Sequence, residues 1–166
     1  MKALMETSRF LVVPADERHL DALLVVYRQS EDFLALGPIH KASAQMVTSD
    51  IESSRKEGGL YCGVWDKEGV LFGVLCFVPK MREETSFLTL LMISASYRGR
   101  GLGSEIVVEL EKHLKTHYST RRIEAGVQVN NLGAIRFWAR NGFRLDDRPK
   151  ALADGTVCFD MAKEIA

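Results

Sequence analysis

Three glycines and two arginines stand close together past the middle of the chain, in the run Tyr97-Arg98-Gly99-Arg100-Gly101-Leu102-Gly103-Ser104. Arginine presents its N–H donors in a planar fork that suits phosphate oxygens. Glycine lets the backbone turn sharply and approach a ligand without a Cβ atom in the way. These residue types favour a phosphate site. The plainer interpretation is a glycine-rich surface turn with two solvated arginines.

The segments on either side of this run would position it for an anion. An apolar segment over residues 87–93 precedes it, and a helical pattern over 105–116 follows it. At the first turn of a helix the backbone N–H groups have no partner within the helix, and the helix dipole adds partial positive charge. A strand, a tight turn and a helix in this order therefore predict a phosphate site at the helix N-terminus.

The run differs from two better known phosphate motifs. It lacks the Gly-Lys-Ser/Thr ending of a P-loop. It also fails the G-x-G-x-x-G pattern in both registers, because Ser104 or Ile106 stands where the last glycine is required. A nucleotide-dependent oxidoreductase is therefore disfavoured. The pattern that remains is Arg-x-x-Gly-x-Gly over residues 98–103.

A second informative stretch runs from Val127 to Phe143. It predicts a helix over 131–141 that Asn131 caps and Gly142 ends. Asn131, Ala134 and Trp138 would share one face of this helix, since they are four and seven residues apart. A capped helix that merely buries aromatic residues is the alternative.

Composition excludes several classes of protein. The 166 residues suit one domain over 1–166, and the 22 basic and 22 acidic residues cancel, whereas a nucleic-acid binder usually has a basic excess. No apolar run is long enough to cross a bilayer, and the N-terminus has no signal-peptide core, so we expect a cytoplasmic protein without membrane contact. Three cysteines without metal-type spacing are expected to be free thiols: Cys62, Cys76 and Cys158.

The other segments complete an α/β pattern. Further strands are expected over residues 8–13, 60–65, 70–78, 123–129, 143–145 and 157–161, and further helices over 16–29 and 44–56. A charged loop is expected over 80–85. The order predicts a single α/β domain with a mixed sheet. Alternation along the strand over 87–93 would put Phe87, Thr89, Leu91 and Ile93 on one face.

The two motifs together resemble the signatures of the GCN5-related N-acetyltransferase (GNAT) superfamily. Leu91-Met92-Ile93 with Arg98 to Gly103 is similar to the first signature, and Asn-x-x-Ala-Ile-x-Phe-Trp-x-Arg-Asn-Gly-Phe over 131–143 is similar to the second. The resemblance implies a mixed, mostly antiparallel sheet flanked by helices, with central strands 87–93 and 123–129 splayed apart. It also implies direct transfer of an acetyl group, in a ternary complex, from acetyl-CoA or another acyl-CoA to the primary amine of a small molecule or peptide. Homodimers are frequent in similar folds.

The resemblance also implies a cofactor site. Residues 91–93 would offer backbone groups to the pantetheine arm, residues 98–104 would hold the pyrophosphate, and Asn131 would bond the arm from the other side. Phe137 or Trp138 would pack near the thioester. The implied set is Leu91, Met92, Ile93, Arg98, Gly99, Arg100, Gly101, Leu102, Gly103, Ser104, Asn131, Phe137 and Trp138.

The catalytic groups are less clear. Many relatives carry a tyrosine as general acid at the position of Trp138, but the indole N–H cannot act as an acid at neutral pH. Glu31 and Glu84 are candidate bases. Two carboxylates in the loop after the first helix, Glu31 and Asp32, would suit a cationic amine, and Tyr27 is a further candidate for the acceptor pocket. The absence of a clear base leaves open a non-catalytic module that binds acyl-CoA as a sensor or partner.

Histidines one helical turn apart form the last candidate site. His113 and His117 have a spacing that metals can use, but no third ligand accompanies them, so we expect partly buried histidines and no metal.

Overall fold

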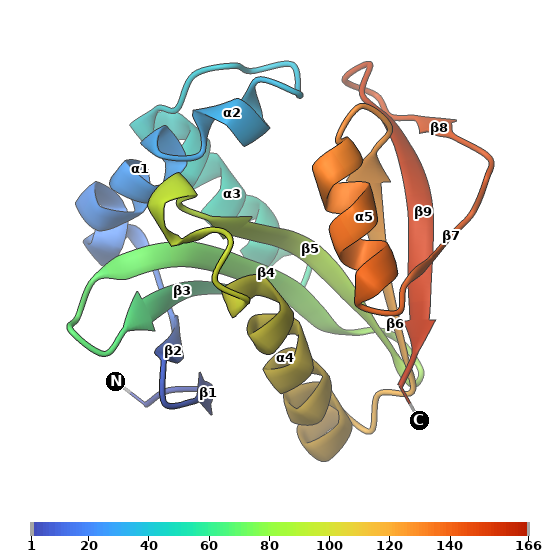
Figure 1. Cartoon of the computed structure of the whole chain (residues 1–166), viewed down its shortest axis with the longest axis horizontal. Coiled ribbons are helices and arrows are strands. Elements are labelled where there is room, and N and C mark those ends of the chain that lie inside the picture. The colour runs from blue at the N-terminus through green and yellow to red at the C-terminus, as the bar shows by residue number, and fades with distance from the viewer. Residues whose placement is uncertain (1, 166) are drawn as a thin grey trace.

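A nine-stranded sheet runs through the computed structural model, which describes residues 2–165 (Figure 1). Its strand order is β1-β2-β3-β4-β5-β6-β9-β7. The short strand β8 lies outside this order and pairs with β9. All neighbouring strands of this order are antiparallel except β5 and β6. The strands are β1 (Met5–Glu6), β2 (Phe10–Pro14), β3 (Leu60–Asp66), β4 (Leu71–Arg82), β5 (Thr85–Ile93), β6 (Arg122–Gln128), β7 (Arg144–Leu145), β8 (Lys150–Ala151) and β9 (Val157–Glu164).

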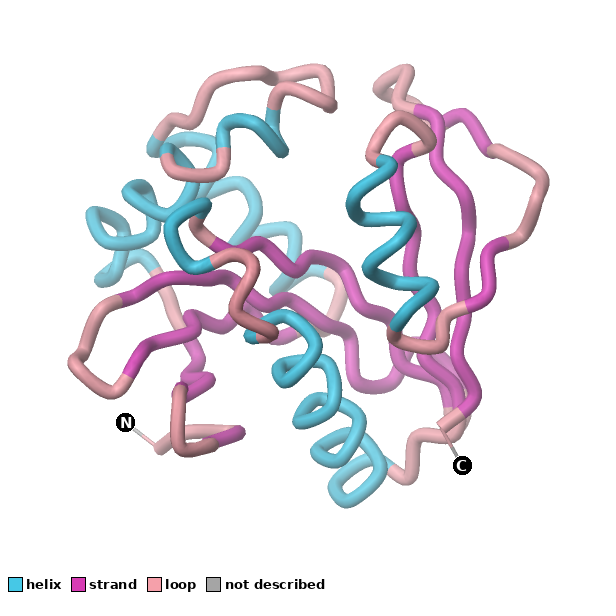
Figure 2. The backbone as a smooth tube through the Cα atoms, in the orientation of Figure 1, coloured by secondary structure: helices cyan, strands magenta, loops and turns pink. Residues whose placement is uncertain are grey.

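Helices cover both faces of this sheet (Figure 2). The α-helices are α1 (Leu20–Arg28), α2 (Glu31–Leu34), α3 (Ala44–Lys56), α4 (Leu102–Tyr118) and α5 (Leu132–Arg140). Side chains cap several helical segments: Asp16 caps a 3-10 turn before α1, Ser43 caps α3 and, as expected, Asn131 caps α5. The mixed, mostly antiparallel sheet flanked by helices confirms the expected fold class.

The core is divided between the two faces. One cluster packs α4 and α5 on the sheet through residues such as Ile106, Leu110 and Trp138. The other packs α1 and α3 through residues such as Leu23 and Ile51. Strand β4 lies between the clusters, which explains why every residue over 71–79 is buried and why its sequence is apolar at almost every position.

The two central strands separate partway along their length. The parallel ladder joins β5 to β6 only over Thr85–Leu88, opposite residues 122–125. Beyond Leu88 the strands diverge, as Figure 1 shows, so the edge of β5 over 89–93 has no strand partner on that side. This confirms the splayed strands.

A β-bulge corrects the expected side-chain alternation of β5. On β4, Phe77 pairs with Leu88 while Cys76 pairs with Leu90, so Thr89 has no partner there. The extra residue reverses the faces, and Leu88 therefore packs with Leu91 and Ile93 toward α4 and α5, while Leu90 and Met92 pack toward α1 and α3. Placing Phe87, Thr89, Leu91 and Ile93 on one face was wrong, since period-two counting assumes an unbroken ladder.

Three further segments differ from the sequence expectation. The expected loop over 80–85 is mostly strand, because β4 and β5 extend to a tight turn in which Glu84 has a φ of 55°. Helix α2 occupies residues expected to form a loop. Strand β9 continues to Glu164, pairing with β6 along its whole length.

Candidate functional site

A groove of about 740 Å³ opens where β5 and β6 diverge. Residues of α2, β5, the glycine-rich turn, the start of α4, β6, α5 and β9 line it. The lining residues are Asp32, Phe33, Leu36, residues 88–93, Tyr97, Arg98, Gly99, residues 101–104, residues 125–128, Asn131, Gly133, Ala134, Phe137, Trp138, Arg140, Cys158 and Met161. The groove thus brings together every residue of the implied cofactor set except Arg100.

The glycine-rich turn presents unpaired backbone donors to this groove. Gly101 precedes the first turn of α4 with a φ of 75°, a left-handed conformation that favours glycine. It provides no side-chain cap, and within residues 2–165 the N–H groups of residues 102–104 have no backbone or side-chain acceptor. A Cβ atom on Gly103 would lie 2.9 Å from the Phe137 ring, so only glycine lets α4 approach α5 this closely. These unpaired N–H groups form a site for an anion.

Arg9 braces the turn from the loop between β1 and β2. Its guanidinium donates to the carbonyl oxygen of Arg100 at 2.8 Å and, through Nε, to Oε2 of Glu105 at 2.7 Å. Arg9 was not among the residues expected at this site. A single arginine so far from the turn along the chain carries no motif, and only the fold brings the two together.

The two arginines of the turn have different surroundings. Arg98 lines the groove, where Nε donates to the Ile93 carbonyl oxygen at 2.8 Å and Nη2 to Oδ1 of Asp32 at 3.1 Å. The hydrogen bonds from Arg98 lower the pKa of the Asp32 carboxyl below its ordinary value. Arg100 turns away from the groove, donates to the Ser96 carbonyl oxygen at 2.9 Å and lies 5.1 Å from the centre of the Tyr97 ring.

Helix α5 forms the opposite wall. Oδ1 of Asn131 accepts the N–H of Ala134 at 3.0 Å, so the cap is confirmed. Phe137 and Trp138 lie edge to face at 4.8 Å between ring centres, and Trp138 is only 8% exposed. This wall is therefore largely apolar, with the Asn131 amide at one end of the helix and the Arg140 charge at the other.

Most of the acidic and tyrosine residues expected in catalysis or acceptor binding lie outside the groove lining. Tyr27 is buried away from the groove, where its hydroxyl donates to Asp50 at 2.7 Å and lies 2.9 Å from the Tyr61 hydroxyl. Glu31 accepts the N–H of Ala42 at 2.9 Å, and Glu84 lies in the β4–β5 turn, outside the groove lining. Of the four acidic and tyrosine candidates, only Asp32 lines the groove, and Arg98 already pairs with it.

The groove holds few titratable groups. Its charged side chains are Asp32, Arg98 and Arg140. Burial raises the pKa of the Cys158 thiol, which keeps it protonated at neutral pH. The sequence analysis assigned no role to Gln128 in this groove, because a lone glutamine in a strand pattern has no motif.

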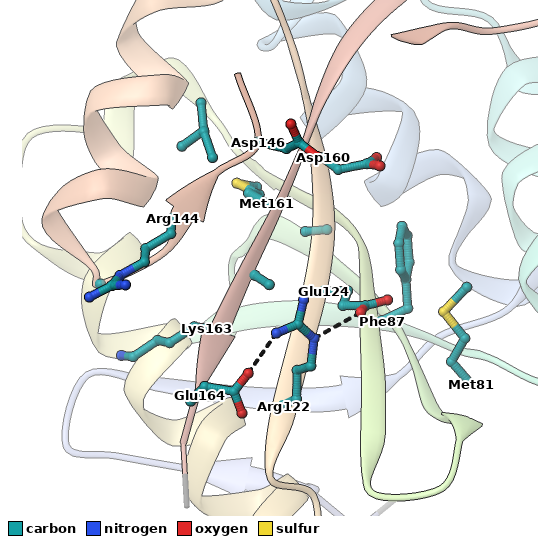
Figure 3. Close-up of a pocket in the computed structure, with 14 residues that line it drawn as sticks. Met81, Phe87, Arg122, Glu124, Arg144, Asp146, Asp160, Met161, Lys163 and Glu164 are labelled. Carbon is teal, nitrogen blue, oxygen red and sulfur yellow. Dashed lines mark hydrogen bonds and ion pairs between the residues drawn. The ribbon is translucent and has the colours of Figure 1, made fainter. Parts of the chain in front are cut away.

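A second cavity, of about 920 Å³, lies against β5, β6, β7 and β9 (Figure 3). Charges that pair with one another line much of it: Arg122 donates to Glu124 at 2.9 Å and to Glu164 at 2.6 Å. It contains neither the glycine-rich turn nor the N-terminus of α4. None of the buried side-chain atoms that lack a hydrogen-bond partner within residues 2–165 belongs to its lining.

The histidine pair on α4 lacks further metal ligands within residues 2–165. His113 and His117 have ring centres 4.6 Å apart, and burial lowers the pKa of His113. Within this range no group of three or more His, Cys, Asp or Glu side chains could hold a metal ion. No helix within the same residues is long and apolar enough to cross a bilayer.

Comparison with known proteins gives consistent matches. Residues 26–143 match the sequence model of the Acetyltransferase (GNAT) family. The chain is 30% identical over 95 residues to the spermine/spermidine N(1)-acetyltransferase of Bacillus subtilis, a match that covers 55% of this chain and 60% of that protein.

Solved structures share the fold. The PaiA N-acetyltransferase of Thermoplasma acidophilum, in complex with coenzyme A, has a TM-score of 0.69 at 20% identity over 93% of this chain and 98% of that one. An acetyltransferase of Salmonella typhimurium that modifies the N-terminal serine of a ribosomal protein has a TM-score of 0.78 at 18% identity over 96% of this chain and 97% of that one.

Proposed function

This chain belongs to the acetyltransferase (GNAT) family, and we propose that it transfers an acetyl group from acetyl-CoA to a primary amine by direct attack in a ternary complex. The observation that supports the proposal most directly is the set of unpaired N–H groups at residues 102–104. These residues line the groove between β5 and β6. A diphosphate at the helix N-terminus and an extended arm in the gap match the two parts of coenzyme A.

The groove residues have distinct roles in this proposal. The turn over 98–104 binds the pyrophosphate, with Arg98 adding charge and Arg9 holding the turn in shape. The unpaired edge of β5 over 89–93 supplies N–H and C=O groups to the amides of the pantetheine arm, as an added strand would. Asn131 bonds the arm from α5, and Phe137 and Trp138 exclude water near the thioester.

The chemistry follows from these groups. A neutral amine nitrogen forms a bond to the acyl carbon, and the carbon–sulfur bond breaks as the tetrahedral intermediate collapses. Backbone N–H groups of the β5 edge stabilise the oxyanion. The charged side chains of the groove are two arginines and a carboxylate already paired with Arg98, so water takes the amine proton and returns one to the thiolate.

The relatives support this class of reaction without defining the substrate. The chain spans about 60% of the length of the Bacillus relative, which is a polyamine acetyltransferase by name. The structural relatives named as N-acetyltransferases are too dissimilar in sequence to indicate more than the fold. The acceptor is therefore proposed only as a primary amine of a small molecule or peptide.

A non-catalytic acyl-CoA-binding module is the second candidate. It is favoured by Trp138, whose indole N–H cannot act as a general acid, and by the lack of an unpaired carboxylate among the groove lining. Release of coenzyme A thiol against a panel of amines separates the two: turnover supports the enzyme, whereas tight acetyl-CoA binding without turnover supports the module.

Binding of acetyl-CoA itself is tested with Arg98→Ala combined with Gly101→Ala. The pair removes a charge and strains the turn, so calorimetry should show loss of acetyl-CoA binding. Arg28→Ala combined with Gly155→Ala is the matched control, because both residues are exposed, Gly155 also has a positive φ, and neither lines the groove. Unchanged affinity in the variant with Arg98→Ala and Gly101→Ala would exclude this turn as the pyrophosphate site.

A further inference from the structure

One polar group in the groove has no partner. Oε1 of Gln128, at the end of β6, is shielded from solvent and accepts no hydrogen bond within residues 2–165. Buried side-chain oxygens in folded proteins nearly always have a donor, because an unmatched one loses its water without compensation. The exceptions that persist often mark a place that a ligand completes.

The side chain of Gln128 lies on the opposite face of the sheet from the turn. Ile123, Ala125 and Val127 alternate along β6 and are buried against α4 and α5. Gly126 and Gln128 therefore lie on the other face, where α2 and its following loop approach. A Cβ atom on Gly37 of that loop would lie 3.3 Å from Nε2 of Gln128. Asn130 fixes the same loop by donating to the Leu36 carbonyl oxygen at 3.2 Å.

Because Gln128 and the glycine-rich turn lie on opposite faces of the sheet, the acceptor and the cofactor can approach the gap from different sides. The pyrophosphate site belongs to α4, and the gap between β5 and β6 connects that face of the sheet to the face of Gln128. A molecule that meets the thioester from the far side of the gap would pass Gln128. The cofactor would approach from the side of α4.

We infer that Gln128 determines acceptor specificity: its side-chain oxygen accepts a hydrogen bond from the acceptor amine, and that amine belongs to a molecule with a single positive charge. The inference rests on the proposed function and names the substrate class for the same groove.

The single charge follows from the groove lining. Its one carboxylate, Asp32, is paired with Arg98, and the lining from α2, the loop after it and β9 also includes the neutral residues Phe33, Leu36 and Cys158. A neutral amide oxygen can hold one amino group in the orientation for attack. The further ammonium groups of a polyamine would find no free counter-charge among these walls, and burying an unpaired charge is strongly unfavourable.

Gln128→Leu tests the hydrogen bond. The variant keeps the size of the side chain and removes the unmatched oxygen, so it should fold with an equal or higher Tm. We expect KM for a monoamine such as phenethylamine to rise about ten-fold, as for one lost hydrogen bond to an amine, while acetyl-CoA affinity stays unchanged. Gln45→Leu, on the exposed surface of α3, is the matched control and should leave both constants unchanged.

Calorimetric titration of phenethylamine into the protein saturated with coenzyme A needs no turnover, so it separates this inference from the proposed function. Wild-type binding about ten-fold tighter than that of Gln128→Leu supports the inference even if no acetyl transfer is seen. Equal affinity in the two proteins, or no wild-type binding, overturns it.

Substrate class is tested with phenethylamine against spermine. We expect higher kcat/KM for the monoamine in the wild type, and a shift of that ratio toward spermine in Gln128→Glu, where a carboxylate replaces the amide. Spermine as the better wild-type substrate would overturn the single-charge class.

Discussion

At the scale of single residues, the groove depends on two glycines of the turn, Gly101 and Gly103, which have no Cβ atom. Gly101 allows a left-handed turn, and Gly103 allows two helices to approach, so the backbone N–H groups of α4 reach the groove uncovered. Arg98, the most conspicuous charge of the motif, is held by Asp32 and a carbonyl group. The anion site of the turn therefore depends more on two glycines and on backbone N–H groups than on charged side chains.

A Gly103→Ala substitution tests this close approach. The new Cβ atom would lie 2.9 Å from Phe137, and overpacking of this kind costs about 1–3 kcal/mol, more than the gain of up to about 1 kcal/mol in helix propensity. We expect the free energy of unfolding in urea to fall.

Gly133→Ala is the matched control, since Gly133 is the second residue of α5 as Gly103 is of α4, and its nearest atom would be 3.9 Å away. The free energy of unfolding of the Gly133→Ala variant should stay the same or rise. Equal effects of the two substitutions would contradict the packing argument.

At the scale of elements, a buried polar network joins α1, α3 and β3. Asp50 of α3 accepts from Tyr27 of α1, whose hydroxyl also meets Tyr61 of β3. Burial raises the pKa of the Asp50 carboxyl above its ordinary value of 3.8, and the hydrogen bond from Tyr27 opposes this only in part. The network fixes α1 and α3 on the sheet but leaves a carboxylate where its charge is costly.

Asp50→Asn tests this cost through pH. Because the pKa is raised in the folded state, the neutral carboxyl stabilises the protein below about pH 3.8, and this contribution is lost as pH rises through the folded pKa. Asparagine keeps an acceptor for Tyr27 without the charge, so its advantage in unfolding free energy over the wild type should grow from pH 4 to pH 7. Ser49→Ala, an exposed neighbour, should show no such trend. A constant difference between Asp50→Asn and the wild type would refute the buried charge.

The elements also show how far sequence reasoning could reach. The glycine-rich turn before a helix and the cap at Asn131 depend on local residue types, and they could be predicted. The splayed strands could be expected only from the resemblance of the two motifs to a known family. The bulge at Thr89 could not, because no glycine or proline marks it and only the partner strand reveals the extra residue. Glu31 was expected in the acceptor pocket for its charge and its place after the first helix, whereas its carboxylate accepts the N–H of Ala42 in the following loop. Arg9 and Gln128 gain their significance only from distant neighbours.

At the scale of the whole molecule, the central ladder is short. Only Thr85–Leu88 joins the strands β1 to β5 to the strands β6 to β9 across the sheet. The packing of α4 and α5 against one core also connects the halves, as does the hydrogen bond from Asn130 to the Leu36 carbonyl oxygen. A ligand that bridges the gap would therefore contact both halves and stabilise the fold as a whole.

Thermal unfolding with coenzyme A measures this stabilisation. At one hundred times its dissociation constant, a ligand specific for the folded state adds about 2.7 kcal/mol. For a chain of this length that corresponds to a rise in Tm of roughly 5–10 °C. Pantetheine, which lacks the diphosphate, should give a much smaller shift at the same concentration. Equal shifts with the two compounds would argue against the anion site at α4.

Every residue type except proline carries a backbone N–H, so the unpaired stretch of β5 makes little demand on side-chain identity. The positions over 89–93 need only fill the two cores and keep the bulge in register. Mutations can therefore accumulate along this edge without closing the opening. A chain of this design is free to diverge widely in sequence and still retain the same gap in its sheet.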